Sequence, residues 1–153
     1  MIQIDYNSQP VQSALNELLS RMGDLTPVMN DIGGVLEARV RERFETETDP
    51  LGGAWAPWAD SYNPATGGTR PTNGNSTILD LYGDMLNSLS WQADSTSVTL
   101  GFGVPYAAYH EFGTTKMDRR GLLFADPNAG TLAPNDENDI MDVLRDYLTQ
   151  AIP

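Results

Sequence analysis

The stretch from Val98 to Gly113 constrains the fold of this chain more than any other. Apolar side chains alternate with threonine or glycine as far as Phe102, which is the period of a β-strand. Pro105 then stands where the first turn of a helix tolerates proline, and aromatic side chains recur at helical spacing up to Phe112. Gly113 can adopt the left-handed conformation that ends a helix. The stretch therefore predicts a strand, a break and one short aromatic helix.

Apolar periodicity predicts helices on both sides of this stretch. A stripe that begins at Val11 predicts a first helix ending before Gly23, and Thr26 is expected to be the N-cap of a second helix. Similar spacing predicts a short helix over residues 77–88 and a final helix that starts near residue 135. We expect the charged face of the second helix to be solvated or to contact a partner. That face consists of Glu37, Arg39, Arg41, Glu42, Arg43 and Glu45.

A second alternating run, Leu89 to Ala93, precedes the strand that ends at Phe102. The polar residues 94–97 between the two runs are typical of a turn, so we expect an antiparallel hairpin. Together these patterns predict an α+β fold, in which an N-terminal helical pair and a C-terminal helix pack on a small antiparallel sheet. The length favours a single domain over residues 1–153.

Two long stretches lack any regular pattern, at about residues 46–75 and 114–134. The first is rich in proline and glycine, and it is longer than an ordinary loop. It also carries Trp55, Trp58 and Tyr62, whereas disordered linkers are poor in aromatic residues. We therefore expect irregular arms that complete their packing against neighbouring molecules. The first arm should be partly mobile in the isolated subunit and ordered in an assembly.

Composition excludes several classes of protein. The formal net charge of −12 argues against a general nucleic-acid binder, which needs a basic face. The absence of cysteine excludes disulfides and thiolate metal sites. We expect no membrane span, because no window is apolar enough, and no signal peptide, because the N-terminus lacks a basic region.

The aromatic helix holds the only histidine of the chain, His110, next to Glu111. Adjacent helical residues point about 100° apart, so this pair cannot share one proton in catalysis. No second histidine is available for a zinc site. We expect His110 to be structural, without a metal or cofactor. The alternative is a small ligand-binding or hydrolytic domain that uses His110 and nearby carboxylates.

The basic residues of this acidic chain are unevenly placed. One cluster is Arg39, Arg41 and Arg43, and the other is Lys116, Arg119 and Arg120. We expect one of these clusters to face an acidic surface of a neighbouring subunit or an adjoining protein. Apolar contacts from Trp55 or Tyr109 should supply most of the affinity, because exposed ion pairs contribute only about 0–1 kcal/mol each.

Two motifs in this chain resemble those of a known family. The first comprises Asp49-Pro50, Gly53, Trp55 and Trp58, and the second is the run from Tyr106 to Gly113. With the flanking helices they extend from about Phe44 to Leu148 and are similar to the phage virion morphogenesis family, the tail completion proteins of Mu-like and P2-like phages.

The resemblance implies a non-catalytic structural protein of the head–tail junction, which forms a homo-oligomeric ring in the neck or completes the tail. It implies contacts with the tail tube or terminator and with a head-side connector, but none with a membrane or with specific nucleic-acid sequences. The protein would reside in the virion, and in the host cytoplasm during assembly. The expected interface residues are Asp49, Pro50, Trp55, Trp58, Tyr106, Tyr109, His110, Glu111, Phe112, Arg119 and Arg120.

Overall fold

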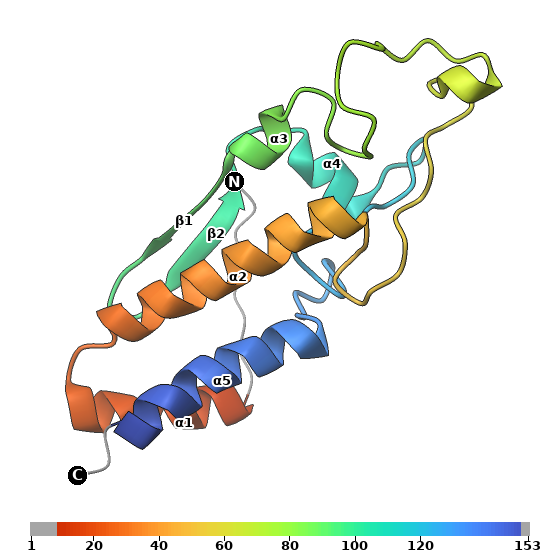
Figure 1. Cartoon of the computed structure of the whole chain (residues 1–153). Coiled ribbons are helices and arrows are strands. Elements are labelled where there is room, and N and C mark those ends of the chain that lie inside the picture. The colour runs from red at the N-terminus through yellow and green to blue at the C-terminus, as the bar shows by residue number, and fades with distance from the viewer. Residues whose placement is uncertain (1–8, 151–153) are drawn as a thin grey trace.

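A computed structural model of the chain describes residues 9–150 (Figure 1). Five α-helices, one 3₁₀ turn and one two-stranded sheet make up the regular structure of this part of the chain. In chain order the elements are α1 Gln9–Met22, α2 Thr26–Thr46, η1 Pro64–Thr66, α3 Asp84–Asn87, β1 Leu89–Ala93, β2 Val98–Phe102, α4 Ala107–Phe112 and α5 Pro134–Gln150.

Helix α2 is the central element. It lies against both strands on one side and against α5 on the other, and α1 packs on α5 (Figure 1). One apolar cluster joins α1, α2 and α5 and includes Leu18, Val28 and Leu144. This arrangement confirms the α+β fold, with α2 as the helix that contacts the sheet most extensively.

The hairpin forms as the alternation predicts. Leu89 pairs with Phe102, and Ala93 pairs with Val98 beside a turn in which the Asp94 carboxylate accepts backbone N–H groups. Trp91 lies on α2 so closely that a Cβ at Gly33 would be 2.4 Å from its ring. The hairpin is therefore seated directly on the backbone of α2.

A second apolar cluster joins the end of α2 to the irregular segments. Phe44 packs edge-on against Trp55, with ring centroids 5.3 Å apart, and it also contacts Phe102. Leu122, Leu123 and Phe124 are buried in the same cluster although they belong to no helix or strand. The second core is thus built largely from irregular backbone.

Several details of the sequence prediction were wrong. The helix expected over residues 77–88 is reduced to α3, because Leu79 and Gly83 have positive φ angles that a continuous helix cannot contain. Thr26 is not the N-cap of α2. That position belongs to Leu25, while the Asp24 carboxylate accepts the Thr26 N–H. Between residues 9 and 150, no helix is long and apolar enough to cross a membrane.

Candidate interaction site

The short helix α4 presents its aromatic side chains to the outside. Tyr106, Tyr109 and Phe112 are 42%, 59% and 45% exposed. Spaced three residues apart, they lie on one side of the helical turn that begins at Tyr106. Ala107 and Glu111 face inward and are buried. The helix thus has a closed inner face and an open aromatic outer face.

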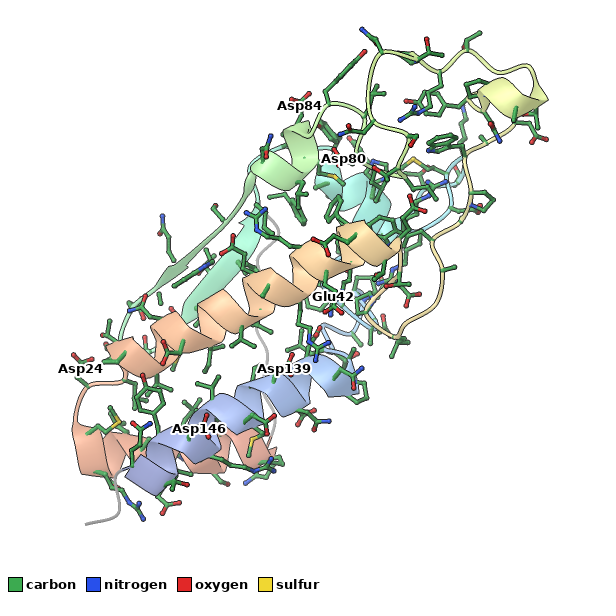
Figure 2. All side chains as sticks on the ribbon, in the orientation of Figure 1. Asp24, Glu42, Asp80, Asp84, Asp139 and Asp146 are labelled. Atoms are coloured by element: carbon green, nitrogen blue, oxygen red, sulfur yellow. The ribbon has the colours of Figure 1, made fainter. Side chains whose placement is uncertain are left out.

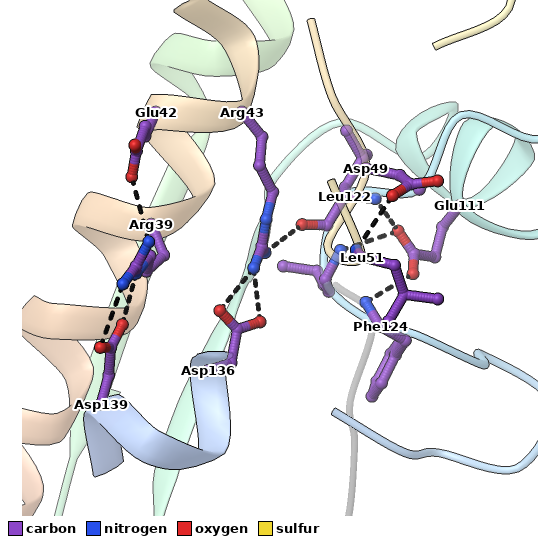
Figure 3. A network of polar contacts seen from close by, with 12 residues as sticks. Arg39, Glu42, Arg43, Asp49, Leu51, Glu111, Leu122, Phe124, Asp136 and Asp139 are labelled. Carbon is purple, nitrogen blue, oxygen red and sulfur yellow. Dashed lines mark hydrogen bonds and ion pairs between the residues drawn. The ribbon is translucent and has the colours of Figure 1, made fainter. Parts of the chain in front are cut away.

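The inner face is held by the carboxylate of Glu111, which is completely buried (Figure 3). One carboxylate oxygen accepts the N–H groups of Leu122 and Leu123 at 2.6 and 3.0 Å, and the other accepts the N–H of Phe124 at 3.0 Å. These buried amides have no strand or helix partner of their own, so they depend on the carboxylate. Glu111 therefore organises the irregular backbone of residues 122–124.

Arg119 contacts both Glu111 and the loop that the Glu111 carboxylate binds. Its guanidinium donates to the Glu111 carbonyl and the Phe124 carbonyl, both at 2.7 Å, and lies 3.4 Å from the Glu111 carboxylate. The backbone of Arg119 packs closely against Gly113, since a Cβ at position 113 would lie 3.0 Å from the Arg119 backbone nitrogen. Gly113 also has a positive φ of 72°, as expected for the residue that ends the aromatic helix.

Trp55 and Arg120 join the two irregular segments. The Trp55 indole N–H donates to the Gly121 carbonyl at 2.9 Å. The Arg120 guanidinium donates to the carbonyls of Ala56 and Pro57 at 2.8 and 2.7 Å. Both side chains are buried, so of Trp55 and Tyr109, the two residues expected to supply apolar contacts, only Tyr109 is exposed in the isolated subunit.

Arg43 was also misplaced on the solvated face of the second helix. It is buried, and it donates to the Leu122 carbonyl at 2.7 Å and to both oxygens of Asp136 at 2.5 Å. Burial raises the pKa of Asp136, and the neighbouring guanidinium of Arg43 opposes that rise. Arg39 and Arg41 likewise pair with Asp139 and Glu37 (Figure 3 shows Arg39 with Asp139). This basic cluster is thus neutralised within the subunit.

His110 lies on the side of α4 that faces a cavity of about 730 Å³. Its buried Nδ1 has no hydrogen-bond partner within the described residues, and its backbone carbonyl accepts the Arg120 N–H. Burial, followed by the positive charge of Arg120, lowers the pKa of His110 below its ordinary value of 6.5. These surroundings favour the neutral form of the imidazole.

The geometry gives little support to an acid–base site at His110. The Glu111 carboxylate is occupied by backbone N–H groups, and no other carboxylate hydrogen-bonds to the Nδ1 of His110 in the described chain. Residues 9–150 also contain no group of three or more acidic or histidine side chains placed to hold a metal ion.

The expected interface residues fall into three sets by exposure. The exposed ones are Tyr106, Tyr109 and Phe112. The half-buried ones are Asp49, Trp58, His110 and Arg119. The buried ones are Pro50, Trp55, Glu111 and Arg120. Only the first set forms an open surface, and its contact with a partner stays a prediction.

Sequence reasoning missed Arg70 and the role of Asp136. Arg70 is buried in the first irregular segment, where its guanidinium lies 4.2 Å from the ring centre of Trp58. The sequence signal for this cation–π contact was an arginine that follows aromatic residues in a segment rich in glycine and proline.

Comparison with known proteins identifies the relatives of this chain. A protein of Haemophilus influenzae named "Mu-like prophage FluMu G protein 2" is 28% identical over 156 residues, which cover 96% of each chain. "Putative capsid assembly protein G" of Escherichia phage Mu is 28% identical over 147 residues, 93% of this chain and 90% of the relative. No solved structure matches. The model of the phage virion morphogenesis family matches residues 6–149, and the chain therefore belongs to that family.

Proposed function

We propose that this protein is a non-enzymatic structural subunit of the phage head–tail junction, which completes the tail or neck so that head and tail can join. Membership of a virion morphogenesis family supports a role in virion assembly. One relative bears a name that refers to capsid assembly. In this proposal residues 1–153 act as one assembly domain, without a cofactor, and form a homo-oligomeric ring in the virion.

The observation that carries the proposal is the aromatic outer face of α4. Tyr106, Tyr109 and Phe112 together expose an apolar surface on a small acidic protein. Aromatic side chains that are exposed in a group, rather than singly, are typical of protein interfaces. Burying them against a partner would supply the apolar contact that the charged surface of this chain cannot.

The inner face of α4 makes this surface rigid. A helix of six residues is not stable by itself. Glu111 and Arg119 fasten it to buried backbone, so the aromatic side chains are presented in a fixed arrangement before any partner arrives. The expected partners are the tail tube or terminator protein and a head-side connector.

The test is complementation of a phage that carries a nonsense mutation in this gene. Tyr109→Ala, alone and combined with Phe112→Ala, should leave the protein folded but reduce infectious particles, with separate heads and tails visible by electron microscopy. Leu19→Ala is the matched control, because Leu19 is a similarly exposed apolar residue on α1.

Normal joining of heads and tails by the folded double variant would contradict the proposal. A loss of joining with Leu19→Ala as well would show that the aromatic face has no special role.

A further inference from the structure

Most cations of this chain are neutralised inside the subunit. The sequence has nine lysine and arginine residues, all of them in the described part of the chain. Six of these lie within ion-pair distance of a carboxylate of the same subunit. They are Arg21, Arg39, Arg41, Arg43, Arg119 and Arg145. The chain therefore has few positive charges left for contact with another molecule.

The other three cations, Arg70, Lys116 and Arg120, all line the cavity beside His110. They come from two segments that are far apart in the sequence. Within residues 9–150, none of them is paired with a carboxylate. Within the described part of the chain, the lysine and arginine side chains without an ion pair therefore all lie at one cavity.

The hydrogen bonds of the two arginines are all to backbone carbonyls and not to carboxylates. Arg120 donates to two backbone carbonyls, and Arg70 donates to the carbonyls of Pro71 and Asn75. Carbonyl oxygens satisfy the N–H groups but carry no formal charge. Arg70 is only 8% exposed, and its Nε has no hydrogen-bond partner in the described chain. A buried guanidinium with an unused N–H favours an anionic partner.

The rest of the cavity wall suits a polypeptide. Trp58, Tyr82 and Tyr106 supply aromatic surface. Asp80, Asp84 and Asp118 also line the cavity. Asp80 and Asp84 lie near α3 (Figure 2). Aspartates in the wall, together with the net charge of −12, disfavour a polyanion such as DNA, whose phosphates lie close together, whereas a segment that brings a single carboxylate meets less repulsion. A peptide segment with a carboxylate and apolar neighbours fits walls of this kind.

We propose that this cavity receives a carboxylate-bearing segment of a second copy of this chain. The inference rests on the proposed ring, in which each subunit must carry a surface that is complementary to a different surface of its neighbour. A second copy has 21 acidic residues, so it has abundant carboxylates, whereas unpaired cations occur only at this cavity in the described residues.

Lys116 makes the contact directly testable, because it is the only lysine of the chain. A carbodiimide joins an amine to a nearby carboxylate with loss of water, which the carbodiimide takes up. Mixed isotope-labelled and unlabelled full-length protein should give cross-linked peptides that join Lys116 of one copy to an acidic residue of another. Lys116→Arg should keep the association and lose the cross-link.

Charge reversal supplies the quantitative test, measured by sedimentation at low salt. Lys116→Glu should weaken self-association by about tenfold, because an attraction becomes a repulsion that salt then screens. Arg145→Glu is the matched control, since Arg145 is an exposed arginine on α5 and not part of the cavity wall. Circular dichroism would confirm that both variants are folded.

Three results would overturn the proposal. One is a protein that stays monomeric at high concentration and low salt. Another is self-association that Lys116→Glu and Arg145→Glu weaken equally. The third is binding of duplex DNA that Lys116→Glu abolishes, which would assign the cavity to nucleic acid. Normal joining of heads and tails by the Lys116→Glu variant would count against this cavity alone, whereas the α4 variants test the proposed function separately.

Discussion

Two irregular regions of this molecule differ in what holds them. In the buried loop, residues 119–124, the N–H groups of residues 122–124 bond to the Glu111 carboxylate, and the carbonyls of Gly121, Leu122 and Phe124 accept from the side chains of Trp55, Arg43 and Arg119. The outer loop, residues 57–75, projects beyond the end of α2 (Figure 1). Its backbone hydrogen bonds from Tyr62 to Arg70 all end within the loop itself.

This difference shows that irregular backbone can be held in place in two different ways. In the buried loop, charged side chains make the hydrogen bonds that a neighbouring strand would otherwise make to the backbone, so irregular backbone becomes part of the core. In the outer loop, local turns and the stacking of Arg70 on Trp58 give a structure with few ties to the rest of the chain. The two loops should therefore respond very differently to mutation.

The largest effect is expected for Glu111→Ala. It leaves three buried N–H groups without an acceptor and Arg119 without its carboxylate, at a cost of about 3–5 kcal/mol. Urea denaturation measures this loss. Glu111→Gln keeps one acceptor oxygen and should lose about half as much.

Glu45→Ala is the control for this prediction, because Glu45 is an exposed acid near the end of α2. A loss below about 1 kcal/mol for Glu111→Ala would mean that the buried loop is held by its apolar side chains instead.

A smaller loss is expected for Asp136→Asn. This change removes the charge partner of buried Arg43 but keeps an oxygen that can accept one of its N–H groups, so we expect a loss of about 2–3 kcal/mol. Thermal unfolding provides the measurement, with Asp142→Asn on the exposed face of α5 as the neutral comparison. Equal melting temperatures for the two variants would show that Arg43 does not need Asp136 in the core.

In the outer loop, Arg70→Ala should change dynamics more than stability. Loss of the stacking of this buried arginine on Trp58 costs about 1–2 kcal/mol, and we expect amide exchange to increase about fivefold within residues 57–75. Exchange in residues 119–124 should stay unchanged. An increase in both loops would erase the distinction between them. The same experiment on the unmodified protein tests the predicted mobility of the first arm.

The smallest effect concerns pH, through His110, which lies between the two loops. The pKa of His110 is lowered in the folded protein, so below pH 6.5 the unfolded chain binds more protons than the folded chain does. Stability from this group is complete above pH 6.5 and is lost as the pH falls toward the folded pKa. His110→Asn should flatten the decline of stability between pH 7.5 and pH 5.5. An unaltered decline would show that other groups cause it.

Local patterns were sufficient to predict the hairpin and four of the five helices in the described residues. The alternation from Leu89 to Phe102 and the apolar stripes of α1, α2 and α5 are periodic patterns within short windows, so they can be read directly from the sequence. The helix expected over residues 77–88 failed for the opposite reason, since the positive φ of Leu79 is set by the packing around it.

The candidate site was harder to predict. Its aromatic helix is visible in the sequence, and the exposure of Tyr109 matches a surface role. The contacts of Glu111 and Arg43 are not visible, because their partners include backbone groups of residues 122–124, and no residue type encodes those. A carboxylate within a run of mainly aromatic and alanine residues was the one sequence signal for the Glu111 contacts.

The attachment of α4 to the buried loop has a thermodynamic consequence for assembly. A helix of this length is marginal by itself, so α4 and the backbone that Glu111 holds stabilise each other. A partner that binds the formed aromatic face therefore stabilises residues 119–124 by the same coupling free energy with which that loop improves partner binding. The two sides of α4 act as linked sites. Binding of a partner to the aromatic face should therefore slow amide hydrogen exchange in residues 119–124.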